Sequence, residues 1–154
     1  MAVKTIAVLG AGTMGHGIAH AAIAAGFDTA LTYTRRRRQF GHTLAHFQIV
    51  QQRLVRMLAD VTAMQLYCLQ TARLAERGAL TDTLAGLAKL HNTTKARSVL
   101  AEARDLLGGN GILLDYHVMR HMADIEAVHT FEGTETMQTL IVGRDITGIS
   151  AFTH

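Results

Sequence analysis

The chain has 154 residues, enough for one ordinary domain, and a formal net charge of +3 at neutral pH. Hydrophobic residues make up 49% of it, but only 5% are aromatic, and it contains neither proline nor tryptophan. Because proline is absent and the abundant alanine, leucine and arginine favour helices, the composition predicts a mainly α-helical domain.

Cysteine usage and hydropathy exclude two further classes of protein. The single cysteine, Cys68, cannot pair within the chain, which argues against a secreted disulfide scaffold. No stretch reaches the roughly 18 uninterrupted apolar residues of a membrane span, and the amino terminus lacks the apolar run of a signal peptide. We therefore expect a soluble protein of the cytoplasm, or of the mitochondrial matrix in a eukaryote, with no membrane partner.

The amino-terminal segment carries a different pattern from the rest of the chain. Residues 5–9 form a short apolar run that ends at a glycine, which predicts a buried strand and a glycine-rich turn. A helical pattern then begins at Thr13, a suitable N-cap. For residues 27–34 a second strand and a continued helix are both compatible with the pattern. Gly26 favours a helix stop, whereas the residues that follow favour a helix running on to Arg38.

Downstream of residue 40 the apolar residues keep a three-to-four spacing. The spacing predicts a long helix ending near Gly78, a second over residues 81–107, a shorter one over 115–125 and a last one beginning near Thr134. The second helix is expected to bury Leu84, Leu87, Ala88, Thr94, Val99 and Leu106. Packed antiparallel, these helices give a bundle preceded by one short strand and a glycine-rich turn.

Four consecutive arginines at residues 35–38 are the main basic cluster. Such a run can bind nucleic acid, but no aromatic residues are interleaved with it and no second basic cluster follows. We interpret it as a solvated helix end, where cations meet the negative end of the helix dipole, and predict no nucleic-acid partner.

Four short patterns follow one another in a fixed order. They are the patterns at residues 37–41, 44–48, 107–111 and 131–134. Together they resemble the carboxy-terminal helical domain of the acyl-CoA dehydrogenase family over residues 28–154. The stretches at residues 115–121 and 146–153 resemble glutaryl-CoA dehydrogenases in particular.

The resemblance implies a chemistry and a set of roles. In that family a carboxylate removes the α-proton of an acyl-CoA thioester while a hydride leaves the β-carbon for a flavin. The resemblance gives the role of base to Glu132, for which Phe131 and Val128 are expected to provide apolar surroundings. It places Arg37 at the FAD pyrophosphate of a neighbouring subunit, which implies a homo-oligomer. The other FAD contacts that it implies are Gln39, Phe40, Gln48, Gly108, Gly109 and Thr134.

The sequence also departs from that family. Phe131 stands where glutaryl-CoA dehydrogenases tend to have tyrosine, so a hydroxyl is lost beside the base. The amino-terminal helical domain and the middle β-domain, which supply most of the flavin and acyl-CoA pocket, are missing. We expect little or no activity from this chain alone. An alternative is a non-catalytic helical oligomerisation module that lends Arg37 and Gln48 to a partner's flavin site.

A second resemblance concerns residues 3–27, which are similar to the NAD-binding start of 3-hydroxyacyl-CoA dehydrogenases. A Gly-x-Gly-x-x-Gly motif follows the predicted strand and opens a helix, the context of a dinucleotide fingerprint. The NAD-binding residues it implies are Gly10, Gly12 and Gly15. The acidic residue expected about 20 residues further on is absent, because Thr34 and Arg35 stand there.

These two resemblances divide the chain into residues 1–27, a partial Rossmann-like βα unit, and residues 28–154, the helical domain. One βα unit cannot complete a parallel sheet. The chain therefore looks like a fusion, and a fragment of an NAD-dependent 3-hydroxyacyl-CoA dehydrogenase is a third hypothesis for its function.

Overall fold

The computed structural model of the chain describes the backbone of residues 14–151 and the side chains of residues 23–151. The predicted strand at residues 5–9, the turn after it and the predicted cap Thr13 lie outside the described residues.

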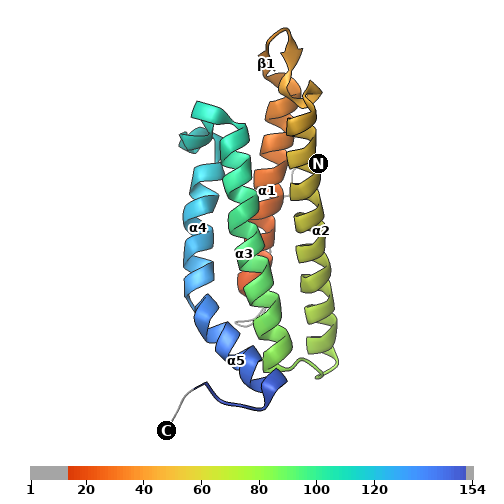
Figure 1. Cartoon of the computed structure of the whole chain (residues 1–154), viewed down its shortest axis with the longest axis vertical. Coiled ribbons are helices and arrows are strands. Elements are labelled where there is room, and N and C mark those ends of the chain that lie inside the picture. The colour runs from red at the N-terminus through yellow and green to blue at the C-terminus, as the bar shows by residue number, and fades with distance from the viewer. Residues whose placement is uncertain (1–13, 152–154) are drawn as a thin grey trace.

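Within the described part, five α-helices form an antiparallel bundle (Figure 1). They are α1 (Met14–Arg36), α2 (Gln48–Glu76), α3 (Asp82–Leu106), α4 (Val118–Thr130) and α5 (Glu135–Thr147). The helix α3 packs against all four others, and α5 continues below α4 in the view of Figure 1. The predicted antiparallel helical bundle is confirmed.

Residues 27–34 are helical, which settles the alternative that the sequence left open. Phe27, Ala30 and Thr34 are buried, at the spacing that one face of a helix requires. Gly26 does not end the helix. A Cβ placed on it would lie 2.6 Å from Leu100 Cδ2, so this glycine allows α1 to approach α3 closely.

A hairpin follows α1, which ends at Arg36 and not at Arg38 as the sequence favoured. Arg35 and Arg36 lie in its last turn, as predicted for a helix end, whereas Arg38 belongs to the hairpin. Strand β1 (Arg38–Gln39) pairs antiparallel with β2 (His42–Thr43). Phe40 and Gly41 form the turn, with φ of 52° and 80°, as the common two-residue hairpin turn requires. A 3-10 turn (Leu44–His46) then leads into α2. The sequence did not predict this hairpin, because strands of two residues are too short to show an alternating pattern.

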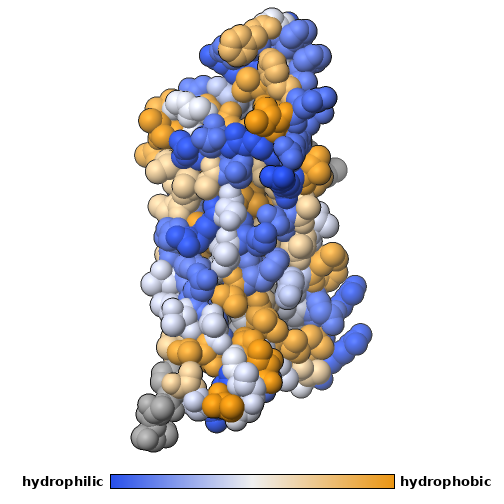
Figure 2. Space-filling model, viewed as in Figure 1, coloured by the Kyte–Doolittle hydropathy of each residue, from blue (hydrophilic) through white to orange (hydrophobic). Residues whose placement is uncertain are grey.

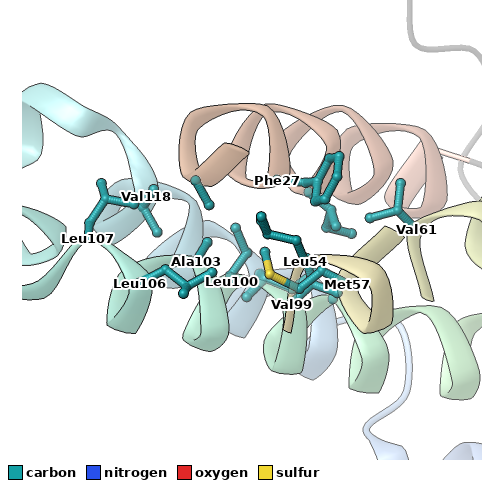
Figure 3. Close-up of a cluster of buried hydrophobic side chains, with 14 of the residues drawn as sticks. Phe27, Leu54, Met57, Val61, Val99, Leu100, Ala103, Leu106, Leu107 and Val118 are labelled. Carbon is teal, nitrogen blue, oxygen red and sulfur yellow. The ribbon is translucent and has the colours of Figure 1, made fainter. Parts of the chain in front are cut away.

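The core lies between α1, α2, α3 and α4 (Figure 3). Leu100, at its centre, is fully buried, and burying a leucine side chain contributes about 2 kcal/mol to folding. The ten side chains labelled in Figure 3 are Phe27, Leu54, Met57, Val61, Val99, Leu100, Ala103, Leu106, Leu107 and Val118.

Two residues of the predicted buried face of α3 are exposed instead, Leu84 and Thr94. The buried face includes Asn92 and Thr93, and the Asn92 Nδ2 lies 3.4 Å from the Met64 carbonyl oxygen. Because α3 has neighbours on several sides, small and polar residues face the core, and the apolar pattern alone misplaces its inner face.

The ends of the later helices follow local capping. Thr81 caps α3, since its side chain accepts a hydrogen bond from the Leu84 amide at 3.2 Å. The fourth helix was predicted over residues 115–125, and both ends were wrong. The observed helix α4 extends from Val118 to Thr130. Its start is set by His117, whose left-handed backbone (φ 61°) follows a 3-10 turn (Leu114–Tyr116). Of the helices in residues 14–151, none combines the length and apolar character that a membrane crossing needs.

Arg53 joins α2 to α3 through two carboxylates, and its removal gives a first testable prediction. Its guanidinium lies 2.5 Å from Glu102 and 2.6 Å from Asp105. Because these side chains are partly solvated, we expect Arg53→Met to lower the free energy of unfolding by about 1 kcal/mol at pH 7. The hydrogen bond from Arg53 lowers the pKa of Asp105, so this stabilisation is complete above the ordinary carboxyl pKa and is lost as the pH falls through the lowered value.

Urea unfolding of both proteins at pH 7 and at about pH 3 measures this difference. Arg56→Met, which changes an exposed arginine of the same helix, is the control and should have little effect. A loss that is equal at both pH values, or equal in both variants, would contradict the assignment.

Candidate functional site

An open pocket of about 410 Å³ lies where the end of α1 and the hairpin meet the end of α3. It brings together two motifs that are far apart in the sequence: Arg37 and Gln39 on one side, Gly108 and Gly109 on the other. All four are among the predicted FAD-binding residues. The whole lining consists of Tyr33, Arg37, Gln39, Leu44, residues 105–107, Gly108, Gly109 and Asn110.

The glycines of the turn after α3 have different roles. A Cβ on Gly108 or Gly109 would meet no atom within 4 Å, so their backbone borders open space. A Cβ on Gly111 would lie 2.0 Å from the Arg104 carbonyl oxygen. Gly111 is therefore required for the turn to pack against α3, whereas the first two glycines leave room for a ligand beside the backbone.

The pocket carries an available positive charge. Across it, Asp105 is engaged by Arg53 at 2.6 Å and by Arg104 at 3.1 Å. No carboxylate among residues 23–151 lies within ion-pair distance of the Arg37 guanidinium. A guanidinium in this state is suited to bind a phosphate or carboxylate through paired hydrogen bonds.

A second pocket, of about 580 Å³, shares Tyr33, Arg37 and Asn110 with the first and extends along α1 to Asp28. The Asn110 side chain donates a hydrogen bond to the Tyr33 hydroxyl at 2.9 Å. The Tyr33 ring packs edge to face on Tyr116 at 5.9 Å between centroids. Tyr33 and Asn110 were not among the site residues predicted from the sequence. A signal existed for Tyr33, because it lies one helical turn before Arg37 and on the same face.

Three predicted FAD contacts lie outside the pocket, namely Phe40, Gln48 and Thr134, the last of which precedes α5. Phe40, at the tip of the hairpin, is 88% exposed, and its ring contacts Phe47 edge to face at 6.4 Å. Gln48 is the first residue of α2 and is also exposed. Phe40 and Gln48 lie on the hairpin end of the molecule, but neither lines the pocket with Arg37.

Glu132 lies in the short turn between α4 and α5. Its side chain is exposed and its backbone is left-handed, with φ of 58°, followed by Gly133 with φ of 97°. This conformation costs a residue with a side chain roughly 1–2 kcal/mol. Thr134 then caps α5, accepting a hydrogen bond from the Met137 amide at 3.4 Å, as predicted for the residue that opens this helix.

Two side chains bind the carbonyl groups of this turn. The Lys89 ammonium, from α3, donates to the carbonyl oxygens of Phe131 and Gly133 and lies 5.7 Å from the Phe131 ring centroid. The buried Gln138 donates to the Glu132 carbonyl at 3.1 Å. Burial lowers the pKa of Lys89, while the charge of Glu132 acts in the opposite direction.

A histidine adds a second connection between the same helices. His129 Nδ1 lies 2.8 Å from the Thr93 hydroxyl of α3, and its Nε2 lies 3.2 Å from the Glu135 carboxylate of α5. The end of α4 and the start of α5 are thereby held against α3.

The structure does not bring Glu132 and Arg37 together. Lys89 contacts the Glu132 turn two helical turns from the start of α3, whereas Asp105 lines the pocket at its end. At 1.5 Å per residue these two positions are about 24 Å apart along the helix. Of the predicted NAD-binding residues, Gly10 and Gly12 lie outside the described residues and Gly15 falls in the first turn of α1.

Comparison with known proteins covers nearly the whole chain. The family model of the acyl-CoA dehydrogenase C-terminal domain matches residues 5–147, which include the predicted junction between residues 27 and 28. Among curated relatives, 3-(aryl)acrylate reductase of Clostridium sporogenes is 29% identical over 94% of this chain and 38% of its own length. Cyclohexane-1-carbonyl-CoA dehydrogenase of Geobacter metallireducens is 30% identical over 78% of this chain and 32% of its own length.

Solved structures share the fold. A glutaryl-CoA dehydrogenase of Mycobacterium smegmatis superposes with a TM-score of 0.87 and 37% identity, over 91% of this chain and 37% of that one. A glutaryl-CoA dehydrogenase of the same species in complex with FADH2 gives a TM-score of 0.84 at 32% identity, again over 91% and 37%.

The chain spans about a third of the length of these proteins. The resemblance of residues 3–27 to 3-hydroxyacyl-CoA dehydrogenases gains no support from these matches. The chain belongs to the acyl-CoA dehydrogenase family, of which it contains the carboxy-terminal helical domain.

Proposed function

We propose that this domain takes part in the flavin-dependent α,β-dehydrogenation of an acyl-CoA thioester of the glutaryl-CoA type. The Arg37 pocket would hold the pyrophosphate part of FAD, and Glu132 would be the base. The observation that carries the proposal is the meeting of Arg37 and Gln39 with Gly108 and Gly109 around one open pocket. The relation to a glutaryl-CoA dehydrogenase solved with FADH2 supports the choice of cofactor.

The residues of the pocket fit a dinucleotide. A pyrophosphate is doubly charged, and Arg37 offers a guanidinium with no carboxylate partner among the described residues. Gly108 and Gly109 border space that a side chain would fill. When bound, FAD supplies the acceptor for the hydride that leaves the substrate.

Glu132 has the chemistry of a general base. Its carboxylate is exposed at the surface of this domain and can accept the α-proton of a thioester, which the neighbouring carbonyl group makes acidic. Gln138 and Lys89 bind the backbone carbonyl groups of residues 131–133, so the Cα atom from which the Glu132 side chain extends is held in place.

A homo-oligomer is part of the proposal. Lys89, which contacts the Glu132 turn, and Asp105, which lines the Arg37 pocket, are about 24 Å apart along α3. This separation supports a chain that contributes Arg37 to a neighbouring subunit's flavin. Large apolar side chains are exposed on α2 and α5, among them Val55 (65%), Leu66 (61%) and Ile146 (75%). Figure 2 shows apolar side chains gathered at the lower end of the molecule, where α5 lies. Such patches mark association surfaces.

Titration of the purified chain with FAD, followed by absorption in the flavin bands, tests the proposal. We expect Arg37→Ala to weaken FAD binding about tenfold or more, because a charge-assisted hydrogen bond to phosphate is lost. Arg35→Ala is the matched control, since Arg35 is exposed in the same run and lines neither pocket.

If FAD binding weakens equally in both variants, the net positive charge of the arginine run accounts for the effect, and the specific role of Arg37 is contradicted. A chain that binds no FAD but self-associates would support the oligomerisation module and contradict the flavin site.

A further inference from the structure

Lys89 occupies a particular place relative to Glu132. It belongs to α3, yet its ammonium donates to the carbonyl oxygens of Phe131 and Gly133, the residues on either side of Glu132. Its side chain is half-buried and also lies over the Phe131 ring, 5.7 Å from the centroid. One cation thus contacts three groups of a turn that is more than 40 residues away in the sequence.

The backbone of the turn has a conformation that such a contact can stabilise. Glu132 and Gly133 both have positive φ, of 58° and 97°, and glutamate rarely adopts this conformation without help from its surroundings. Carbonyl oxygens that point toward one place repel each other unless a donor lies between them. Lys89 is that donor, and Gln138 binds the third carbonyl of the turn at 3.1 Å.

We propose that Lys89 is a positioning residue for Glu132: by joining the two flanking carbonyls it fixes the left-handed turn and thereby the direction of the Glu132 carboxylate. This inference rests on the proposed role of Glu132 as base. The orientation of a general base is worth fixing because proton abstraction requires a narrow range of distances to the substrate.

A purely structural role for Lys89, as a link between α3 and the end of α4, is the alternative. The structure contains such a link independently. Thr93 lies one turn after Lys89 on α3 and is 2.8 Å from His129 Nδ1, without touching the turn carbonyls. Thr93→Val is therefore a matched control, because it removes a contact between the same helices and leaves the Lys89 donors in place.

The test uses the full 154-residue chain and NMR spectroscopy, with no flavin or substrate. A strong intraresidue NOE between amide proton and Hα reports a residue with positive φ. We expect Lys89→Met to weaken this NOE at Glu132 and to speed amide hydrogen exchange at Phe131 and Met137 about tenfold, the change expected for one lost charge-assisted hydrogen bond. Lys89→Arg, which retains donors, should keep the wild-type pattern.

An unchanged NOE in Lys89→Met, an equal loss in Thr93→Val, or no rescue by arginine would overturn the proposal. Should Lys89→Met fail to fold, Lys89→Gln keeps the proposal testable, because its shorter side chain should not span both flanking carbonyls. We expect a weaker intraresidue NOE at Glu132 in that variant, and an unchanged NOE overturns the proposal.

The outcome is independent of the flavin titration. Flavin binding with an unaffected turn in Lys89→Met would refute the positioning role and leave the proposed function standing. If Lys89→Met loses the turn and the wild-type chain binds no flavin, the link between Lys89 and the turn stands and the proposed flavin site is contradicted.

Discussion

Replacing Gly111 by alanine is expected to lower the free energy of unfolding by about 3 kcal/mol, at the upper end of what overpacking usually costs. The new Cβ would lie 2.0 Å from the carbonyl oxygen of Arg104 and 2.8 Å from its carbonyl carbon. These are backbone atoms of the last turn of α3, which cannot move aside as the end of a flexible side chain could. The turn at residues 108–112 would have to separate from α3, and the residues of this turn that line the Arg37 pocket would move with it.

Urea unfolding followed by far-UV circular dichroism measures the loss, and Gly109→Ala is the control from the same turn. A Cβ there meets nothing within 4 Å, so its stability should change by no more than about 0.5 kcal/mol. Since Gly109 borders the pocket, the same variant should weaken FAD binding. Similar stability losses at both glycines would contradict the separation into a packing glycine and a ligand-facing one.

Leu100→Ala is expected to cost about 3 kcal/mol, since the change removes a fully buried side chain from a close-packed site. Leu100 fills the space that Gly26 leaves open between α3 and α1. The measurement is again denaturant unfolding. Leu58→Ala, at a position that is 49% exposed, makes the same chemical change on α2 and should cost less than about 1 kcal/mol. A large loss at position 58 would mean that this face is covered in solution.

The helices were predictable where local signals were strong. The ends of α3 were placed within a residue or two, because a threonine cap precedes it and a glycine turn follows. The hairpin at residues 38–43 escaped prediction because its strands have two residues each. Residues 27–34 could not be assigned, because the glycine that resembled a helix stop faces Leu100. Gly26 is needed because α1 packs closely on α3, and a local sequence pattern does not show which helix packs against which residue.

The candidate site was predictable only in part. Arg37 and the glycines after α3 were found through short motifs, and the structure places them around one pocket. Lys89 and Asn110 were missed. Their partners are Phe131, Gly133 and Tyr33, which lie 42 to 77 residues away in sequence. A lysine in a helical pattern resembles any solvated lysine until the fold places a turn beside it.

The central helix has a consequence for how sequences of this domain can vary in length. Because α3 lines the Arg37 pocket at one end and contacts the Glu132 turn near the other, it sets the distance between the pocket and the turn and their relative rotation about the helix axis. One inserted residue between Lys89 and Asp105 would shift them by about 1.5 Å and turn them by about 100°. Lys89 would then point away from the turn. Natural insertions and deletions should therefore collect in the connection at residues 77–81, where a change in length leaves α3 intact.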